Sequence, residues 1–254
     1  MIDEEQKPPW APALGLTLAF LALVAVANVV TDEPPAAAGG IRGTLAGLIF
    51  YGGAVALVGV AAPLWLGARG RVALPLWTTR RMGDNAAAVL VVVFLFARVE
   101  MLVAIVAEGR PAGAVLATFL GPAAVHLAAV TATLGVLLPA LKSRMPAAPA
   151  AVLAALAWTA YHFLQFPAGQ SPGQLFVIGV FGLGYALYYF WSRSLLLTFV
   201  LQHLVATTTF VYAEDYTFGR LDAFFCLSLA IVAAALIAAV VLRRRYAAER
   251  FTYF

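Results

Sequence analysis

The sequence predicts an all-α membrane protein, a polytopic bundle of about eight transmembrane helices. Of its 254 residues, 63% are hydrophobic and only 11% are charged, whereas a soluble domain is about half apolar and about a quarter charged. Several apolar runs are also close to the roughly 20 residues that a helix needs to cross the hydrocarbon core. A β-barrel would alternate apolar and polar residues at every second position, and no such alternation is present.

Polar segments and segments rich in Gly and Pro separate the apolar runs and set the expected bounds of each span. A loop with Pro34, Pro35 and Gly39 follows the first run, and an arginine-containing loop, residues 67–85, follows the second. Shorter turns divide the later runs. Within a single membrane domain, residues 1–254, we therefore expect spans at residues 11–30, 43–66, 86–107, 113–138, 150–166, 175–191, 195–213 and 221–242.

The basic residues predict the orientation of the chain. If both termini are cytoplasmic, twelve of the sixteen Lys and Arg residues lie on the inner side and three in outer loops, with Arg98 inside a span. This asymmetry follows the positive-inside rule and supports eight spans. We therefore expect an integral protein of the bacterial cytoplasmic (inner) membrane, in contact with the lipid bilayer and with other membrane proteins. The net charge of +4 reflects this orientation, so no nucleic-acid partner is expected.

The three histidines, His126, His162 and His203, all lie within expected spans. An ionisable side chain is costly inside a bilayer, so each histidine is a candidate functional residue. If they converge, the three neutral imidazoles form a metal site, or one of them ligates a pigment or haem. The alternative is that each makes an interhelical hydrogen bond. Thr207 follows His203 by four residues, so the two share one helix face.

Two motifs carry a resemblance to a known family. Trp158-Thr-Ala-Tyr-His162 is similar to a Phe-x-x-x-His motif, and His203-Leu-Val-Ala-Thr207 is similar to a His-x-x-x-Asn motif. A Gly-rich run beginning at Gly182 and the basic turn after it are also similar. Together they resemble the CPBP family of intramembrane proteases, also called the CAAX-protease or Abi family, over about residues 120–213. The resemblance implies a CPBP-like bundle, with catalytic positions at His162, His203 and Thr207.

The family's first motif, Glu-Glu-x-x-x-Arg, is where this chain departs from the pattern. Aligned from Gly135, the two glutamates fall on Ala129 and Val130 and the arginine on Leu134. A rival alignment that uses Arg144 puts Pro139 and Ala140 at the glutamates. The resemblance implies that a glutamate activates the attacking water, and neither alignment supplies a side chain that takes a proton. We therefore expect a catalytically inactive pseudo-protease that acts as a scaffold or as a partner-binding subunit of a membrane complex.

Two other functions stay open from the sequence. One is an active intramembrane endopeptidase with rearranged catalytic groups, in which Glu100, inside the third expected span, acts with His162 and His203. The other is a membrane subunit that binds a metal or another cofactor through the three histidines. The aromatic residues from Tyr185 to Trp191 end a span on the expected inner side and are interpreted as an interfacial belt.

Overall fold

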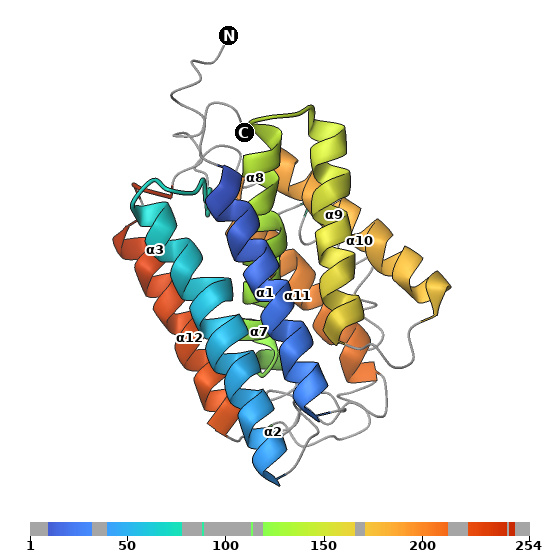
Figure 1. The fold of residues 1–254 in the computed structure, drawn as a ribbon. Coiled ribbons are helices and arrows are strands. Elements are labelled where there is room, and N and C mark those ends of the chain that lie inside the picture. The colour runs from blue at the N-terminus through green and yellow to red at the C-terminus, as the bar shows by residue number, and fades with distance from the viewer. Residues whose placement is uncertain are drawn as a thin grey trace.

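The computed structural model describes residues 10–31, 40–77, 119–165, 171–212, 223–242 and 244–246, together with residues 88 and 113. Apart from short connections, these residues are helical. Segments α2, η2 and α3 run on as one helix, as do α7, η3 and α8, which gives seven helices in the described residues (Figure 1). The elements are α1 (Trp10–Thr31), α2 (Gly40–Gly47), η2 (Leu48–Ala61), α3 (Ala62–Ala68), α7 (Ala123–Val130), η3 (Thr131–Gly135), α8 (Leu137–Lys142), α9 (Ala147–Gln165), α10 (Pro172–Ser192), α11 (Leu195–Tyr212) and α12 (Ala223–Val241).

The all-helical membrane class is confirmed, but the count of eight spans is not. Among the described residues, five helices are long and apolar enough to cross a membrane: Trp10–Val30, Gly43–Ala68, Ala123–Lys142, Ala147–Gln165 and Pro172–Ser192. The described apolar parts of α11 and α12 have 10–17 residues each. The expected span 86–107 lies outside the described residues. The protein is thus an integral membrane protein, with five candidate spans among the described residues.

Only part of the fourth expected span, residues 113–138, lies in the described residues. Within that part, Gly121 and Pro122 form a turn directly before α7 begins at Ala123. The helix then continues past Pro139 and ends at Lys142. Its first turn receives help from another helix, since the backbone N–H of Ala124 donates to Ser228 Oγ on α12 at 3.0 Å. This bond satisfies one of the N–H groups that a helix start leaves without an intrahelical partner.

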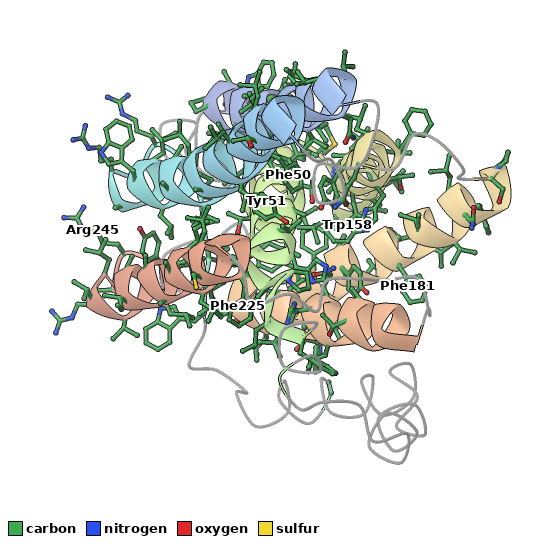
Figure 2. All side chains as sticks on the ribbon, turned by 90° about the horizontal axis from the view of Figure 1, so that it is seen from below. Phe50, Tyr51, Trp158, Phe181, Phe225 and Arg245 are labelled. Atoms are coloured by element: carbon green, nitrogen blue, oxygen red, sulfur yellow. The ribbon has the colours of Figure 1, made fainter. Side chains whose placement is uncertain are left out.

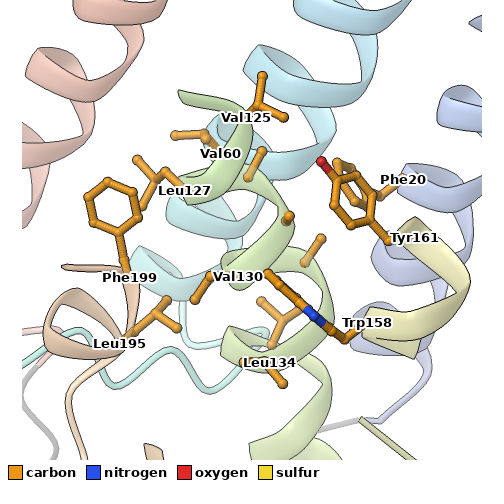
Figure 3. Packing of buried hydrophobic residues seen from close by; sticks show 14 of the residues in the cluster. Phe20, Val60, Val125, Leu127, Val130, Leu134, Trp158, Tyr161, Leu195 and Phe199 are labelled. Atoms are coloured by element: carbon orange, nitrogen blue, oxygen red, sulfur yellow. The ribbon is translucent and has the colours of Figure 1, made fainter. Parts of the chain in front are cut away.

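The continuous helix α7–η3–α8 lies at the centre of the bundle. Helices α1, η2, α9, α11 and α12 surround it, as the view along the bundle shows (Figure 2). Almost all of its residues are buried, as expected of a helix that is apolar on all sides. Figure 3 shows side chains from α1, η2, α9 and α11 packed around Val130 and Leu134 of this helix.

Small residues let neighbouring helices approach the central helix closely. A Cβ atom on Gly59 of η2 would lie 2.4 Å from Ala128 Cβ, and one on Gly135 would lie 2.6 Å from Leu195 Cδ2. Neither site has room for a side chain. This close approach is typical of membrane bundles, in which packing of small residues replaces the hydrophobic driving force of water.

Residues 72–77, which we call the strap, form a largely buried part of the loop expected at residues 67–85. Val72 through Leu76 are buried at one end of the bundle. The carbonyl of Pro75 accepts from the backbone N–H of Leu195 at 3.1 Å, and that of Leu76 accepts from the N–H of Leu196 at 3.0 Å. The carbonyls of the strap can be buried because they accept hydrogen bonds from N–H groups at the start of α11, which have no partner within their own helix.

The segment after α12 closes the same end of the bundle. Tyr246 is only 1% exposed, and its hydroxyl donates to the carbonyl of Leu64 at 2.6 Å. Its own carbonyl accepts from the N–H of Leu76 in the strap at 3.0 Å. The guanidinium of Arg245 donates to the carbonyl of Ala68. Residues 245–246 therefore tie the end of α3 to the strap.

Candidate functional site

The structure brings His126 and His203 into direct contact. His126 lies in the first turn of α7 and His203 in the middle of α11. Their Nδ1 atoms are 2.9 Å apart, and the ring centroids are separated by 5.1 Å with the rings at 65°. Phe199, one turn before His203, stacks on its ring at 5.5 Å. The pair is thus a hydrogen bond between two imidazoles within a largely apolar helix interface.

The contact between the two rings requires one donor and one acceptor. In the neutral pair, one Nδ1 carries a hydrogen and the other accepts it. The contact forms with either histidine as the donor.

His162 lies near the end of α9, within electrostatic range of His126. Its Nδ1 is 3.1 Å from the carbonyl of Trp158, one turn earlier. A carbonyl only accepts, so Nδ1 of His162 carries the hydrogen and Nε2 of the neutral ring carries a lone pair. That nitrogen is chemically suited to accept a proton or to bind a metal.

Aromatic side chains fix the His162 ring. Trp158 lies 4.6 Å from it and Tyr161 lies 4.9 Å from it, measured between ring centroids. Trp158 is itself held against the backbone of α10, where a Cβ on Gly182 would be 2.7 Å from its Cδ1. Tyr185 of α10 meets the Trp158 ring edge-on at 5.6 Å. The Gly-rich part of α10 therefore positions the tryptophan that holds the histidine.

The aromatic residues at the end of α10 only partly form an interfacial belt. Trp191 is exposed, but Tyr185 and Tyr189 are buried. The hydroxyl of Tyr189 donates to the carbonyl of Pro75 in the strap at 3.2 Å. These tyrosines face the bundle because their hydroxyls or rings have partners there, which a count of aromatic residues does not show.

Thr207 turns its hydroxyl toward its own helix. The hydroxyl donates to the carbonyl of His203 at 2.6 Å, and the carbonyl of Leu204 lies 3.4 Å away. The side chain is fully buried. Donation to a carbonyl four residues earlier is a common use of threonine in membrane helices. The hydroxyl proton is therefore occupied, and the oxygen of Thr207 keeps only its capacity to accept.

The positions aligned with the family's glutamates are apolar and tightly packed. Ala129, Val130 and Leu134 all have 0% exposure in the central helix. In the rival alignment Pro139 and Ala140 are buried as well, while Arg144 is exposed. The buried polar side chains of the described residues include no aspartate or glutamate. Glu100 and Arg98 lie outside the described residues.

Metal-ligating side chains do not gather in the part of the chain that the structure describes. No group of three His, Cys, Asp or Glu side chains there has an arrangement that could hold a metal ion. The His126–His203 contact uses the two Nδ1 atoms for each other. A metal bound by all three imidazoles would need these rings to turn.

Sequence reasoning missed one polar residue of this region, Gln202. It is 2% exposed, and its Oε1 has no hydrogen-bond partner among the described residues. The signal was present, because a polar side chain inside an apolar run is itself a functional candidate.

The comparison with protein families agrees with the resemblance over part of the chain. Residues 131–209 match the family described as Type II CAAX prenyl endopeptidase Rce1-like. The match runs from η3 to α11 and includes His162, His203 and Thr207. It begins just after Ala129 and Val130 and leaves out His126. The chain matches no curated protein and no solved structure.

Proposed function

We propose that the chain is a catalytically inactive member of the CAAX-protease-like group that serves as a scaffold or partner-binding subunit of a membrane complex. The observation that carries the proposal is the packing of Ala129 and Val130. Both are fully buried in the central helix, at the positions where the resemblance implies the carboxylates that activate water. Neither side chain accepts a proton, and loss of a general base typically costs about 10²–10⁴-fold in rate.

The remaining groups near the histidines support the same proposal. Nδ1 of His203 is bonded to Nδ1 of His126. The hydroxyl of Thr207 donates its hydrogen to the carbonyl of His203 in the same helix. These are the contacts of a site in which polar groups satisfy one another, rather than of a site that leaves a nucleophile activated.

The test of catalysis is a direct assay. The purified chain is incubated in detergent with a farnesylated peptide that ends in a CAAX sequence, and release of the terminal tripeptide is followed. An active CAAX peptidase assayed alongside shows that the conditions permit cleavage. We expect no release above the protein-free control. Release that disappears in both the His162→Ala and His203→Ala variants would show that the chain is an active peptidase with rearranged groups.

The test of the scaffold role is the composition of the complex. The chain is extracted from its native membranes in mild detergent and its subunits are quantified by mass spectrometry. We expect a second membrane protein in a fixed molar ratio. A chain that purifies alone and monodisperse would contradict a scaffold role, whatever the peptidase assay shows.

The contact between His126 and His203 favours one second candidate, a membrane subunit that binds a metal or another cofactor. The Nδ1 atoms of the two imidazoles are 2.9 Å apart, so one helix interface holds two nitrogen ligands of a kind that transition metals bind. Elemental analysis and visible absorption of the same purified sample test this candidate. A stoichiometric metal that is lost in His126→Ala would support it, and a metal-free, colourless protein would remove it.

A further inference from the structure

Basic residues from two distant parts of the chain meet at the last turn of α3. The guanidinium of Arg245 donates to the carbonyl of Ala68, and Arg69 is the next residue after it. The hydroxyl of Tyr246 reaches the carbonyl of Leu64, one turn earlier. Figure 2 shows Arg245 at the same end of the bundle as the end of α3. The segment after α12 is therefore held against α3, with the Arg245 guanidinium next to the residue that precedes Arg69.

The side chain of Arg69 lies over the ring of Trp65, one turn earlier in α3. Its central guanidinium carbon is 4.1 Å from the ring centroid. A cation over a ring face needs no acceptor atom, so this contact orients the guanidinium and leaves its N–H groups able to donate. Arg69, Arg71 and Arg244 are all exposed. The guanidinium of Arg69 is thus fixed by the ring and has hydrogen-bond donors at the surface of the molecule.

Acidic residues are lacking in the sequence on either side of these arginines. The chain has no Asp or Glu between Glu33 and Asp84, or between Asp222 and Glu249. The residues that the structure describes include none at all. Like charges gathered at one place repel one another, and an anion bound among them relieves that repulsion. Guanidinium groups suit a phosphate group in particular, because they bind its oxygens through paired N–H donors.

The position of the arginines along their helices favours a lipid over a free anion. The candidate membrane span Gly43–Ala68 ends directly before Arg69, so Arg69 lies at the level of the lipid headgroups. Trp65 is exposed just inside that level, where tryptophan is enriched in membrane proteins. In α12, Val240 and Val241 are exposed and precede the arginines of the second segment. Both segments therefore pass from an apolar surface, suited to acyl chains, to a basic one.

We propose that the last turn of α3 and the segment after α12 form a binding site for one anionic phospholipid. Arg69 donates to the phosphate oxygens, while Arg71, Arg244 and Arg245 add positive charge, and the exposed ring of Trp65 lies against the acyl chains. The site distinguishes lipids by net charge, because a zwitterionic lipid has the same phosphate beside a cation that the arginines repel. This inference goes beyond the proposed function, since lipid binding requires neither catalysis nor a partner protein.

The test is a comparison of two lipids and two variants. Native mass spectrometry of the full chain in detergent is used to titrate phosphatidylglycerol and phosphatidylcholine with the same acyl chains. We expect phosphatidylglycerol to bind more tightly, and Arg69→Gln to weaken its binding by about five-fold. The control is Arg144→Gln, which removes the same charge from an exposed arginine just after α8, at the same end of the bundle, and should have little effect. Equal affinities for the two lipids, or equal losses in the two variants, would overturn the proposal.

A soluble headgroup analogue separates a lipid site from a site for free phosphate. Glycerol 1-phosphate is added to the complex of the unaltered chain with phosphatidylglycerol. We expect the bound lipid to stay in place, because the analogue lacks the acyl chains that meet the apolar surface. Displacement at a concentration similar to that of the lipid would show that the arginines bind phosphate alone and would overturn the assignment. The unaltered chain is used in this arm, so its result does not depend on how a variant folds.

Discussion

At the scale of single residues, Gly182 has the sharpest steric requirement near the histidines. A Cβ at this position would lie 2.7 Å from Cδ1 of Trp158, so Gly182→Ala must displace the tryptophan. We expect a loss of about 1–3 kcal/mol in the free energy of unfolding, as for other overpacked cores. Chemical denaturation in detergent measures this loss.

The same helix provides the control for that substitution. Gly184 has nothing within 4 Å of its would-be Cβ, so Gly184→Ala should be neutral or should stabilise the helix by up to about 1 kcal/mol. Both substitutions change the same residue type two positions apart. Equal effects would show that helix propensity, rather than the contact with Trp158, explains the requirement for glycine.

The candidate residues could be chosen from the sequence, but their pairing could not. Three histidines in apolar runs are conspicuous because ionisable groups are rare there. Which of them touch depends on the register between α7 and α11, and that register is set by glycine and leucine contacts such as Gly135 with Leu195. The residue pattern of a single helix contains no information about the register between two helices.

At the scale of elements, Ser194 joins the strap to α11. Its Oγ donates to the carbonyl of Leu76 at 3.0 Å and accepts from the N–H of Leu197 at 3.3 Å, as a helix N-cap does. Ser194→Ala removes both bonds and should cost about 1–3 kcal/mol. Ser171→Ala, at the exposed capping box that begins α10, removes a cap alone and should cost about 1 kcal/mol. Thermal unfolding of both variants measures the difference, and equal losses would mean that the strap bond adds nothing.

The bounds of a helix could be predicted from hydropathy where turn residues flank its apolar run. The expected first span, residues 11–30, agrees closely with α1 (Trp10–Thr31). The turn at Gly121-Pro122 lies inside an otherwise continuous apolar run, and hydropathy alone does not show it. The burial of the strap could not be predicted either, because an apolar segment between arginines does not reveal that its carbonyls will meet a helix start.

At the scale of the whole molecule, the described basic residues predict the orientation in the membrane. Lys142, Arg193 and Arg245 all lie near the end of the bundle that the strap closes. By the positive-inside rule this end faces the cytoplasm. In a Cys226→Ser background, a membrane-impermeant maleimide should therefore label Gly173→Cys in intact bacterial cells. It should label Arg144→Cys only after the cells are lysed.

These two positions flank α9 and the turn after it, so they report on opposite sides of the bilayer. Arg144 is exposed just before α9, and Gly173 is exposed at the start of α10. The reversed labelling pattern would invert the orientation. Labelling of both positions in intact cells would contradict α9 as a membrane span.

The overall class of the protein was predictable because composition reports directly on the solvent that surrounds a bundle. The number of spans is supported only in part: five of the described helices are long and apolar enough to cross a membrane, and the expected span 86–107 lies outside the described residues.

The contact between Tyr246 and Leu64 also has a consequence for how the protein is made. The two residues are 182 positions apart in the chain. At a synthesis rate of roughly 5–20 residues per second, α3 waits about 9–36 s before its partner leaves the ribosome. During that interval the carbonyl of Leu64 and the strap enter the membrane environment without their last partners. The end of the newborn bundle that the strap closes is therefore the part that an insertase or chaperone would need to shield longest.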